Sequence, residues 1–200
     1  LMASWLNDPL KVTTDIEGNW HVEVATTLSK EPQTINIRSN KSDILLENIL
    51  FGEIWICSGQ SNMQQSLNGY PGQPTYGGTM AISEARNPNL RLFTVERTGS
   101  KIPLKDLEKY VSWQQASPGN VADFSAVAYF FGQKLQEILD VPVGMIHTSW
   151  GGSNVEAWIS KEVISLYQEV DIDKVDISEN TNHIPCALFN AMIHPLMPLD

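Results

Sequence analysis

The chain has 200 residues, 42% of them hydrophobic and 18% charged, and its formal net charge at pH 7 is −10. This composition is ordinary for a globular protein with one sizeable core, or with a core and a small module. The negative charge argues against nucleic acid and anionic membranes as partners, and no apolar run reaches the length of about 18 residues that a membrane span needs. The two cysteines, Cys57 and Cys186, do not make a disulfide framework, so they leave the cellular compartment open.

Residues 1–48 are predicted to form a small β-rich segment. Apolar and polar residues alternate over residues 20–24 and 35–38, and a third apolar stretch covers residues 44–46. Alternation with a period of two is typical of half-buried strands. Short strands separated by turn residues indicate part of a β-sandwich, so we predict a partial sandwich in this region.

Residues 49–200 show a different pattern, in which strands and helices alternate. Strands are predicted at residues 54–57, 90–95 and 142–146, and helices at residues 80–86 and 123–139. The longer helix has apolar residues at helical spacing, and Asp123 stands where an N-cap belongs. Alternating strands and helices predict a parallel sheet with helices on its faces.

Three segments of this region are predicted to be irregular. Residues 67–79 are rich in glycine and proline, and long loops of this kind beyond a strand often form the walls of binding sites. Residues 97–122 show no regular period. Residues 170–176 are acidic and expected to be exposed, but their acidic residues lack the spacing of a calcium-binding loop, so no metal site is predicted there.

A candidate nucleophile follows the first strand of this region. Residues 54–57 form a short apolar run that is typical of a fully buried parallel strand, and small polar residues end it abruptly. In open α/β sheets, ligands and catalytic groups gather beyond the carboxyl ends of the strands, so Ser61 is the candidate. A strand followed by Ser-Gly-x-Ser is also a common turn, and Met63 replaces the second glycine of Gly-x-Ser-x-Gly, which argues against an ordinary α/β-hydrolase.

Three sequence blocks together resemble a known enzyme family. Residues 52–63 read GEIWICSGQSNM, residues 144–158 read GMIHTSWGGSNVEAW, and residues 188–196 read LFNAMIHPL. In this order they resemble the nucleophile block, the oxyanion-glycine block and the following segment of the sialate O-acetylesterase family of SGNH (GDSL-like) hydrolases. The resemblance covers most of residues 10–200. It implies a three-layer α/β/α SGNH-hydrolase-like fold with a parallel sheet in residues 49–200, incomplete at the C-terminus.

The resemblance also implies an activity and a set of site residues. Ser61 would attack an O-acetyl group of sialic acid or another acetylated sugar and form an acyl-serine intermediate. The backbone N–H groups of Ser61 and Gly152 would form the oxyanion hole, although a glycine pair can equally be a tight turn. Gln60, Asn62 and Gly151 would contact the substrate. Neither a metal nor an organic cofactor is implied, and a periplasmic or secreted location is expected.

The general base that this chemistry needs is not found in the sequence. The resemblance implies an Asp-x-x-His motif near the C-terminus, but none of the four histidines has aspartate three residues before it. His147 lies nearest the glycine pair, where we expect a structural or substrate-wall role. We therefore expect the chain, which begins at Leu1, to be a fragment or processed portion. The missing C-terminal part would then be a partner, which could be a separate chain.

Two classes of function remain open at this point. The first is a carbohydrate esterase that lacks its histidine base in the residues given; a thioesterase or lipase would also fit Ser61, but the three blocks favour acetylated sugars. The second is a non-catalytic carbohydrate-binding or interaction module on the same fold. The missing Asp-x-x-His motif favours the second class, and the abrupt end of the predicted sheet favours the first.

Overall fold

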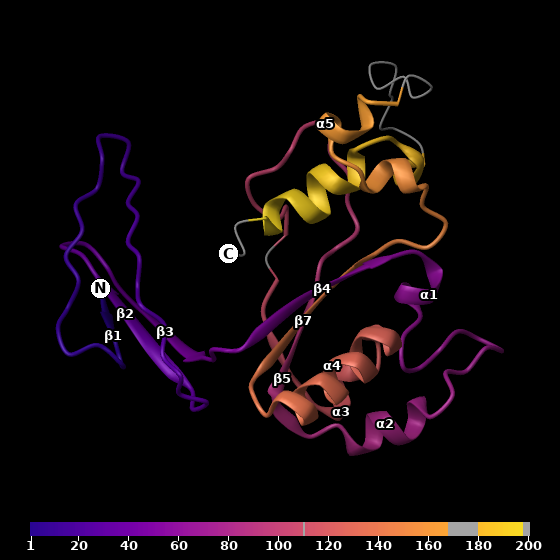
Figure 1. The fold of residues 1–200 in the computed structure, drawn as a ribbon, viewed down its shortest axis with the longest axis horizontal. Coiled ribbons are helices and arrows are strands. Elements are labelled where there is room, and N and C mark those ends of the chain that lie inside the picture. The colour runs from indigo at the N-terminus through magenta and orange to yellow at the C-terminus, as the bar shows by residue number, and fades with distance from the viewer. Residues whose placement is uncertain (110, 168–179, 198–200) are drawn as a thin grey trace. The chain divides into compact units, whose positions relative to one another are not determined.

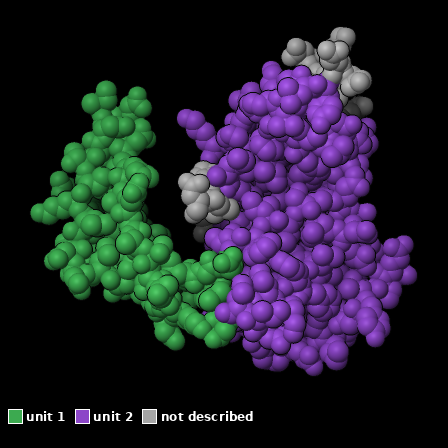
Figure 2. All heavy atoms as spheres, viewed as in Figure 1, with its two compact units in different colours: residues 1–53, 140–142 green, residues 54–139, 143–200 purple. Residues whose placement is uncertain are grey.

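The computed structural model describes residues 1–109, 111–167 and 180–197, so the acidic segment predicted at residues 170–176 lies outside the described residues. Contacts divide the chain into two compact units (Figure 2). The first comprises residues 1–53 and 140–142, and the second comprises residues 54–139 and 143–200. The boundary predicted from the sequence, between residues 48 and 49, lies within a strand of the first unit.

The first unit contains a three-stranded antiparallel sheet. Its strands are β1 (Met2–Ala3), β2 (Gln33–Arg38) and β3 (Asp43–Ile49), in that order. The strands predicted at residues 35–38 and 44–46 are confirmed, and they pair with each other through Ile37 and Ile44. The strand predicted at residues 20–24 is wrong, because these residues adopt no regular structure. Alternation of apolar and polar residues indicates that a segment has two different faces, but a strand also needs a neighbouring strand to accept its backbone hydrogen bonds. Here β1, and not residues 20–24, pairs with β2.

The second unit is built on a four-stranded sheet with the order β4-β7-β5-β6 (Figure 1). The strands are β4 (Glu53–Gly59), β7 (Val143–Ser149), β5 (Asn87–Thr94) and β6 (Gln114–Ala116). β5 and β7 run parallel, whereas the short β6 runs antiparallel to β5 at one edge, within the segment predicted to be irregular. The three predicted strands are confirmed, and the sheet is mixed at this edge.

Helical segments connect these strands and follow the last of them. Those between strands are α1 (Ser61–Gln64), α2 (Gly78–Glu84), α3 (Pro118–Val121) and α4 (Ala126–Leu139). Those after β7 are η1 (Val155–Trp158), α5 (Lys161–Ile164), η2 (Thr181–His183), η3 (Phe189–Ile193) and η4 (His194–Leu196). The predicted N-cap Asp123 is wrong. Its carboxylate accepts a hydrogen bond from Asn68, while the hydroxyl of Ser125 accepts from the N–H of Ala128, which is the bond of an N-cap. No helix among the described residues is long and apolar enough to cross a bilayer.

The sheet of the second unit has a hydrophobic core on each face. Neighbouring residues of β7 enter different cores, because side chains alternate across a strand. Met145 packs in a cluster with Tyr129 of α4, and Ile146 packs in a second cluster with Leu188 and Met192. The sheet therefore lies between two layers, as the α/β/α prediction requires, and its carboxyl edge is free to carry a site.

β4 is an edge strand among the described residues, and this corrects the prediction of a fully buried strand. Ile54, Trp55 and Ile56 are 50%, 41% and 42% exposed, and only Cys57 is buried. β7 pairs with one edge of β4, and no described strand pairs with the other. An apolar run indicates that both faces of a strand can be buried. It does not indicate whether a second strand pairs with each edge of that strand.

Candidate active site

Ser61 lies where β4 ends and α1 begins. β4 ends at Gly59, Gln60 precedes the helix, and Ser61 is its first residue. Figure 1 shows α1 directly after β4. The first N–H groups of a helix have no acceptor within the helix, and the N–H of Ser61 has none elsewhere in the described residues. Ser61 is exposed, so both its hydroxyl and its N–H are accessible.

The glycine pair forms a tight turn just after β7. The N–H of Ser153 donates to the carbonyl oxygen of Trp150 at 3.2 Å, and Gly152 has a φ of 74°. A positive φ at the third residue is the geometry of a type II turn, and glycine adopts it without the strain that a Cβ would cause. The predicted glycine turn is therefore present, and its conformation explains the glycine at position 152.

This turn lies directly against Ser61. A Cβ placed on Gly151 would lie 3.6 Å from the Cα of Ser61, which is ordinary van der Waals contact. The N–H of Trp150 donates to the carbonyl oxygen of Gly59 at 3.0 Å, joining the ends of β7 and β4. Because β4 and β7 are neighbours in the sheet, their carboxyl ends bring together two segments that are far apart in the sequence.

Two glutamines fasten the nucleophile segment to the glycine turn. The side-chain oxygen of Gln64 accepts the N–H of Gly151 at 2.5 Å. The side-chain nitrogen of Gln60 donates to the carbonyl oxygen of Ser153. Gln60 and Gln64 lie on either side of Ser61, so the serine is held between two bonds to the same turn.

The backbone bonds of the turn leave one N–H group free. Among the described residues, the N–H groups of Trp150, Gly151 and Ser153 all have acceptors, and that of Asn154 donates to Asn182. The N–H of Gly152 has no acceptor in the same set. Gly152 is exposed, so its N–H needs no protein partner and can bond to water or to a ligand. The site thus presents free N–H groups on Ser61 and Gly152, on two adjacent segments.

His147 is buried within β7 and is bonded away from Ser61. Its Nε2 lies 2.6 Å from the hydroxyl oxygen of Ser149, and its ring packs edge-on against Phe124. Its Nδ1 has no partner among the described residues. Burial, followed by the nearby positive charge of Arg97, lowers the pKa of His147 from 6.5 to about 4. The imidazole is therefore neutral near pH 7, and its burial and its bond to Ser149 are consistent with the expected structural role.

The other three histidines bond to backbone carbonyl groups or belong to the first compact unit. His183 Nε2 is 2.9 Å from the carbonyl oxygen of Gly152, and His194 Nδ1 is 2.9 Å from that of Leu104. His21 is exposed in the first compact unit. Within the described part of the chain, no histidine is hydrogen-bonded to Ser61.

Comparison with known proteins assigns the chain to a family. A model of the carbohydrate esterase family described as sialic acid-specific acetylesterase matches residues 51–190. The chain belongs to this family. The matched region contains both Ser61 and the glycine turn, so the residues that form the site are those that the family model covers.

Individual members of the acetylesterase family agree with this assignment. The sialate O-acetylesterases of Pongo abelii and Homo sapiens are each 30% identical over 199 residues, covering 94% of this chain and 34% of their own length. A crystal structure of a carbohydrate acetylesterase from Xanthomonas citri matches with a TM-score of 0.85 and 29% identity, over 99% of this chain and 42% of that chain. The chain spans about a third of the length of the curated relatives it matches.

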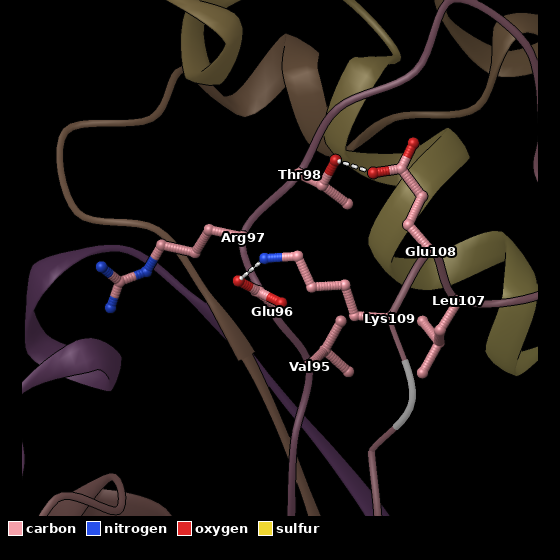
Figure 3. Close-up of a pocket in the computed structure, with 7 residues that line it drawn as sticks. All are labelled: Val95, Glu96, Arg97, Thr98, Leu107, Glu108 and Lys109. Carbon is pink, nitrogen blue, oxygen red and sulfur yellow. Dashed lines mark hydrogen bonds and ion pairs between the residues drawn. The ribbon is translucent and has the colours of Figure 1, made fainter.

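A polar pocket lies near this site at the end of β5, and its charged groups are already paired (Figure 3). It is lined by Val95, Glu96, Arg97, Thr98, Leu107, Glu108 and Lys109. Lys109 pairs with Glu96, and Thr98 donates to Glu108. Arg97 points away from the first pair, and its Nε donates to the carbonyl oxygen of Ser149. No group of three or more metal-binding side chains occurs in the described residues.

For this acetylesterase-family chain, the structure brings together the residues that the sequence singled out. Gln60, Ser61, Asn62, Gly151 and Gly152 lie on the two segments that meet at the ends of β4 and β7. Sequence reasoning missed the contacts of Gln64 and His183 with the glycine turn. Gln64 lies 87 residues from its partner in the sequence, and no local pattern in a single sequence indicates such a pairing.

Proposed function

We propose that this chain forms the nucleophile-bearing part of a serine carbohydrate O-acetylesterase, with sialic acid or another acetylated sugar as substrate. The observation that carries the proposal is the exposed Ser61 beside a glycine turn whose Gly152 N–H is free. The named relatives, which are sialate O-acetylesterases, support the choice of substrate class. A periplasmic or secreted location belongs to the same proposal, and cell fractionation would test it.

The proposed reaction proceeds in two steps at Ser61. The hydroxyl oxygen attacks the acetyl carbonyl carbon as a base removes its proton, and the sugar oxygen leaves with a proton. Water then attacks the acetyl-serine, which releases acetate and restores the serine. The N–H groups of Ser61 and Gly152 would bind the negative oxygen of each tetrahedral intermediate, and such a donor is typically worth about 2.7–4 kcal/mol of the barrier.

Three neighbouring residues are proposed to help hold the substrate. Asn62 is exposed and its amide has no partner among the described residues, which supports a direct contact with the sugar. Gln60 and Gly151 are engaged with Ser153 and Gln64, respectively. They therefore shape the wall of the site that the substrate would contact.

We propose that the base is supplied by a further part of the protein, as the longer relatives allow. Half-exposed Ile54, Trp55 and Ile56 lie on the edge strand that carries the serine, and the ring of Trp55 contacts Phe131 of α4 at 5.1 Å between centroids. Exposed apolar edge strands are pairing sites. An additional parallel strand beside β4 would bring its own carboxyl end, and a histidine carried near it, close to Ser61.

Acetate release from acetylated sialic acid and acetylated xylan tests the proposal, with material of confirmed intact mass. We expect no appreciable turnover by the 200-residue chain alone, activity once the further part is restored, and loss of that activity in Ser61→Ala. Activity of the lone chain that is lost in Ser61→Ala would show that a base lies among its own residues. A completed protein that is inert on every acetyl ester would refute the esterase proposal.

A non-catalytic carbohydrate-binding module on the same fold is the second candidate function. It is favoured by one observation, that no described histidine is bonded to Ser61. Calorimetric titration of the protein completed by its further part, with acetylated and deacetylated sugars, separates the two candidates. A binding module would retain its ligand unchanged and would bind equally well after Ser61→Ala, whereas the esterase would release acetate.

A further inference from the structure

His183 forms a hydrogen bond to the residue whose N–H is the proposed oxyanion donor. Its Nε2 lies 2.9 Å from the carbonyl oxygen of Gly152. A carbonyl oxygen only accepts, so Nε2 must carry the proton in this bond. Both the neutral ring with its proton on Nε2 and the imidazolium can make it. The ring therefore acts as a donor to the backbone and has no free Nε2 lone pair for proton abstraction.

The segment that carries His183 is itself docked on the chain that follows the glycine turn. The N–H of Asn154 donates to the carbonyl oxygen of Asn182 at 3.0 Å, and the N–H of Cys186 donates to that of Glu156 at 2.9 Å. These two bonds hold η2 beside the start of η1. The backbone on either side of His183 is thus held in place, and the bond to Gly152 holds the ring.

The peptide group between Gly151 and Gly152 is the one that most needs such support. It is the central peptide of a type II turn, and rotating it by half a turn converts type II into type I and reverses the direction of its N–H. Neither its carbonyl oxygen nor its N–H has a partner in the described residues. Glycine on both sides offers little steric resistance to the rotation. Its orientation must therefore come from the peptides that flank it.

The turn on either side of this peptide is held by three side chains from two other parts of the chain. Gln64 holds the N–H of Gly151 on one side. On the other side, His183 holds the carbonyl oxygen of Gly152 and Gln60 holds that of Ser153. Of these three side chains, only His183 bonds to Gly152 itself, so it restrains the backbone of the residue that donates.

We propose that His183 is a positioning residue, which holds the Gly152 backbone so that its N–H stays directed at the oxyanion. This inference rests on the proposed esterase function for its catalytic consequence. The restraint on Gly152 is a property of the chain itself and can be measured without turnover. His183→Ala removes the donor, whereas His183→Gln keeps an N–H donor on a side chain of similar reach.

The kinetic test compares these variants in the protein completed by its further part. We expect His183→Ala to lower kcat by about tenfold or more with KM nearly unchanged, because misplaced catalytic groups lose rate before they lose binding. His183→Gln should recover most of that rate. The pH profile of kcat should keep its shape in both, and His21→Ala, which removes an exposed histidine of the other unit, should have no effect. An altered pH profile, or a kcat unchanged in His183→Ala, would overturn the proposal.

The second test uses ¹⁵N relaxation and amide exchange of Gly152 in the 200-residue chain. We expect the order parameter of the Gly152 N–H to fall and its exchange to quicken in His183→Ala, with recovery in His183→Gln. Gly72 has a similar φ of 75° but no neighbour within 4 Å of a Cβ placed on it, so it serves as the internal reference. Unchanged Gly152 dynamics would refute the positioning role even in an active enzyme. Loosened Gly152 in a completed protein that cleaves no acetyl ester would support the restraint and reject the esterase function.

Discussion

The side-chain oxygen of Gln64 accepts the N–H of Gly151 at 2.5 Å, and this one bond decides which glycine of the pair can serve as a donor. A donor already bonded to protein is not available to a substrate oxygen. The bond also connects α1, which begins with the nucleophile, to the turn after β7. Gly152 is thereby left as the donor of the pair.

Replacing Gln64 by methionine should therefore weaken both the fold and the proposed chemistry. Methionine has a similar length but cannot accept the N–H of Gly151, and losing a hydrogen bond of this kind costs about 1 kcal/mol. We expect the free energy of unfolding in urea to fall by about that amount, and kcat of the completed protein to fall more than KM rises. Gln136→Met, which removes a bond to Asn87 away from the site, is the matched control for stability. Equal kinetic losses in both variants would contradict the assignment.

Gly152→Ala should cost both stability and activity, whereas Gly72→Ala should cost stability alone. The two glycines have φ values of 74° and 75°, so an alanine at either position is strained by about 1–2 kcal/mol. Only Gly152 lies in the proposed oxyanion hole. Alanine keeps the backbone N–H, but relief of the strain would turn that N–H away from the oxyanion, and loss of one donor typically lowers kcat by about 100- to 1,000-fold. Chemical denaturation and acetate release measure the two effects. A Gly152→Ala variant that lost stability but kept a normal kcat would show that the glycine conformation is not needed for catalysis.

The stability of the chain should fall as the pH decreases from about 6.5 toward 4, partly because of His147. Its pKa is lowered from 6.5 to about 4 by burial, and secondarily by Arg97. In this window the unfolded chain therefore binds a proton at His147, whereas the folded chain does not. The contribution of the neutral imidazole to the free energy of unfolding is complete above the unfolded-state pKa and is lost as the pH falls below it. The loss from this residue reaches at most about 3 kcal/mol at the acid end.

His147→Gln removes this titration and should flatten the dependence of the unfolding free energy on pH between those limits. Urea denaturation at several pH values across the window measures the slope. The parent chain, measured at the same pH values, is the reference for the slope. If His147→Gln left this slope unchanged, the imidazole would not be held neutral by burial.

Ile56→Lys should prevent completion of the site while sparing the isolated chain. Ile56 is 42% exposed on the edge strand, so a charged side chain there can reach water, and the unfolding free energy should change by less than about 1 kcal/mol. A lysine on an edge strand opposes pairing with another strand. We expect activity not to be restored when the further part is added, and hydrogen exchange along β4 not to slow. Restoration equal to that of the parent chain would show that this edge is not where the further part binds.

Much of the second unit could be predicted from the sequence, because its elements are encoded locally. The apolar runs at residues 54–57 and 90–95 and the helical spacing before Leu139 all correspond to observed elements. The pairing of strands with one another could not be predicted from local patterns. Residues 20–24 alternate between apolar and polar but form no strand, and β4 is apolar although most of its residues are exposed. Whether a segment is paired and buried depends on segments far away in the sequence, and a local pattern does not identify them.

The candidate site shows the same division. Ser61 and the glycine pair could be singled out because strand ends and glycine turns have local signatures. Gln64 and His183 could not, since each acts through one hydrogen bond to a distant part of the chain. The N-cap was misassigned to Asp123 for a related reason: aspartate and serine both suit a cap, and the contact of Asp123 with Asn68 is long-range.

The two glutamines that flank Ser61 have a consequence for how the site tolerates change. Since Gln60 and Gln64 both bond to the turn at residues 150–153, the spacing between serine and glycine is maintained by a short bridge at the end of the sheet. Substitutions that shift the strands slightly would carry nucleophile and turn along together. Residues 60–64 and 149–154 are thus expected to behave as one structural unit. Exchanging both segments together between homologous chains should preserve the geometry of the site. Exchanging only one of them should disrupt it.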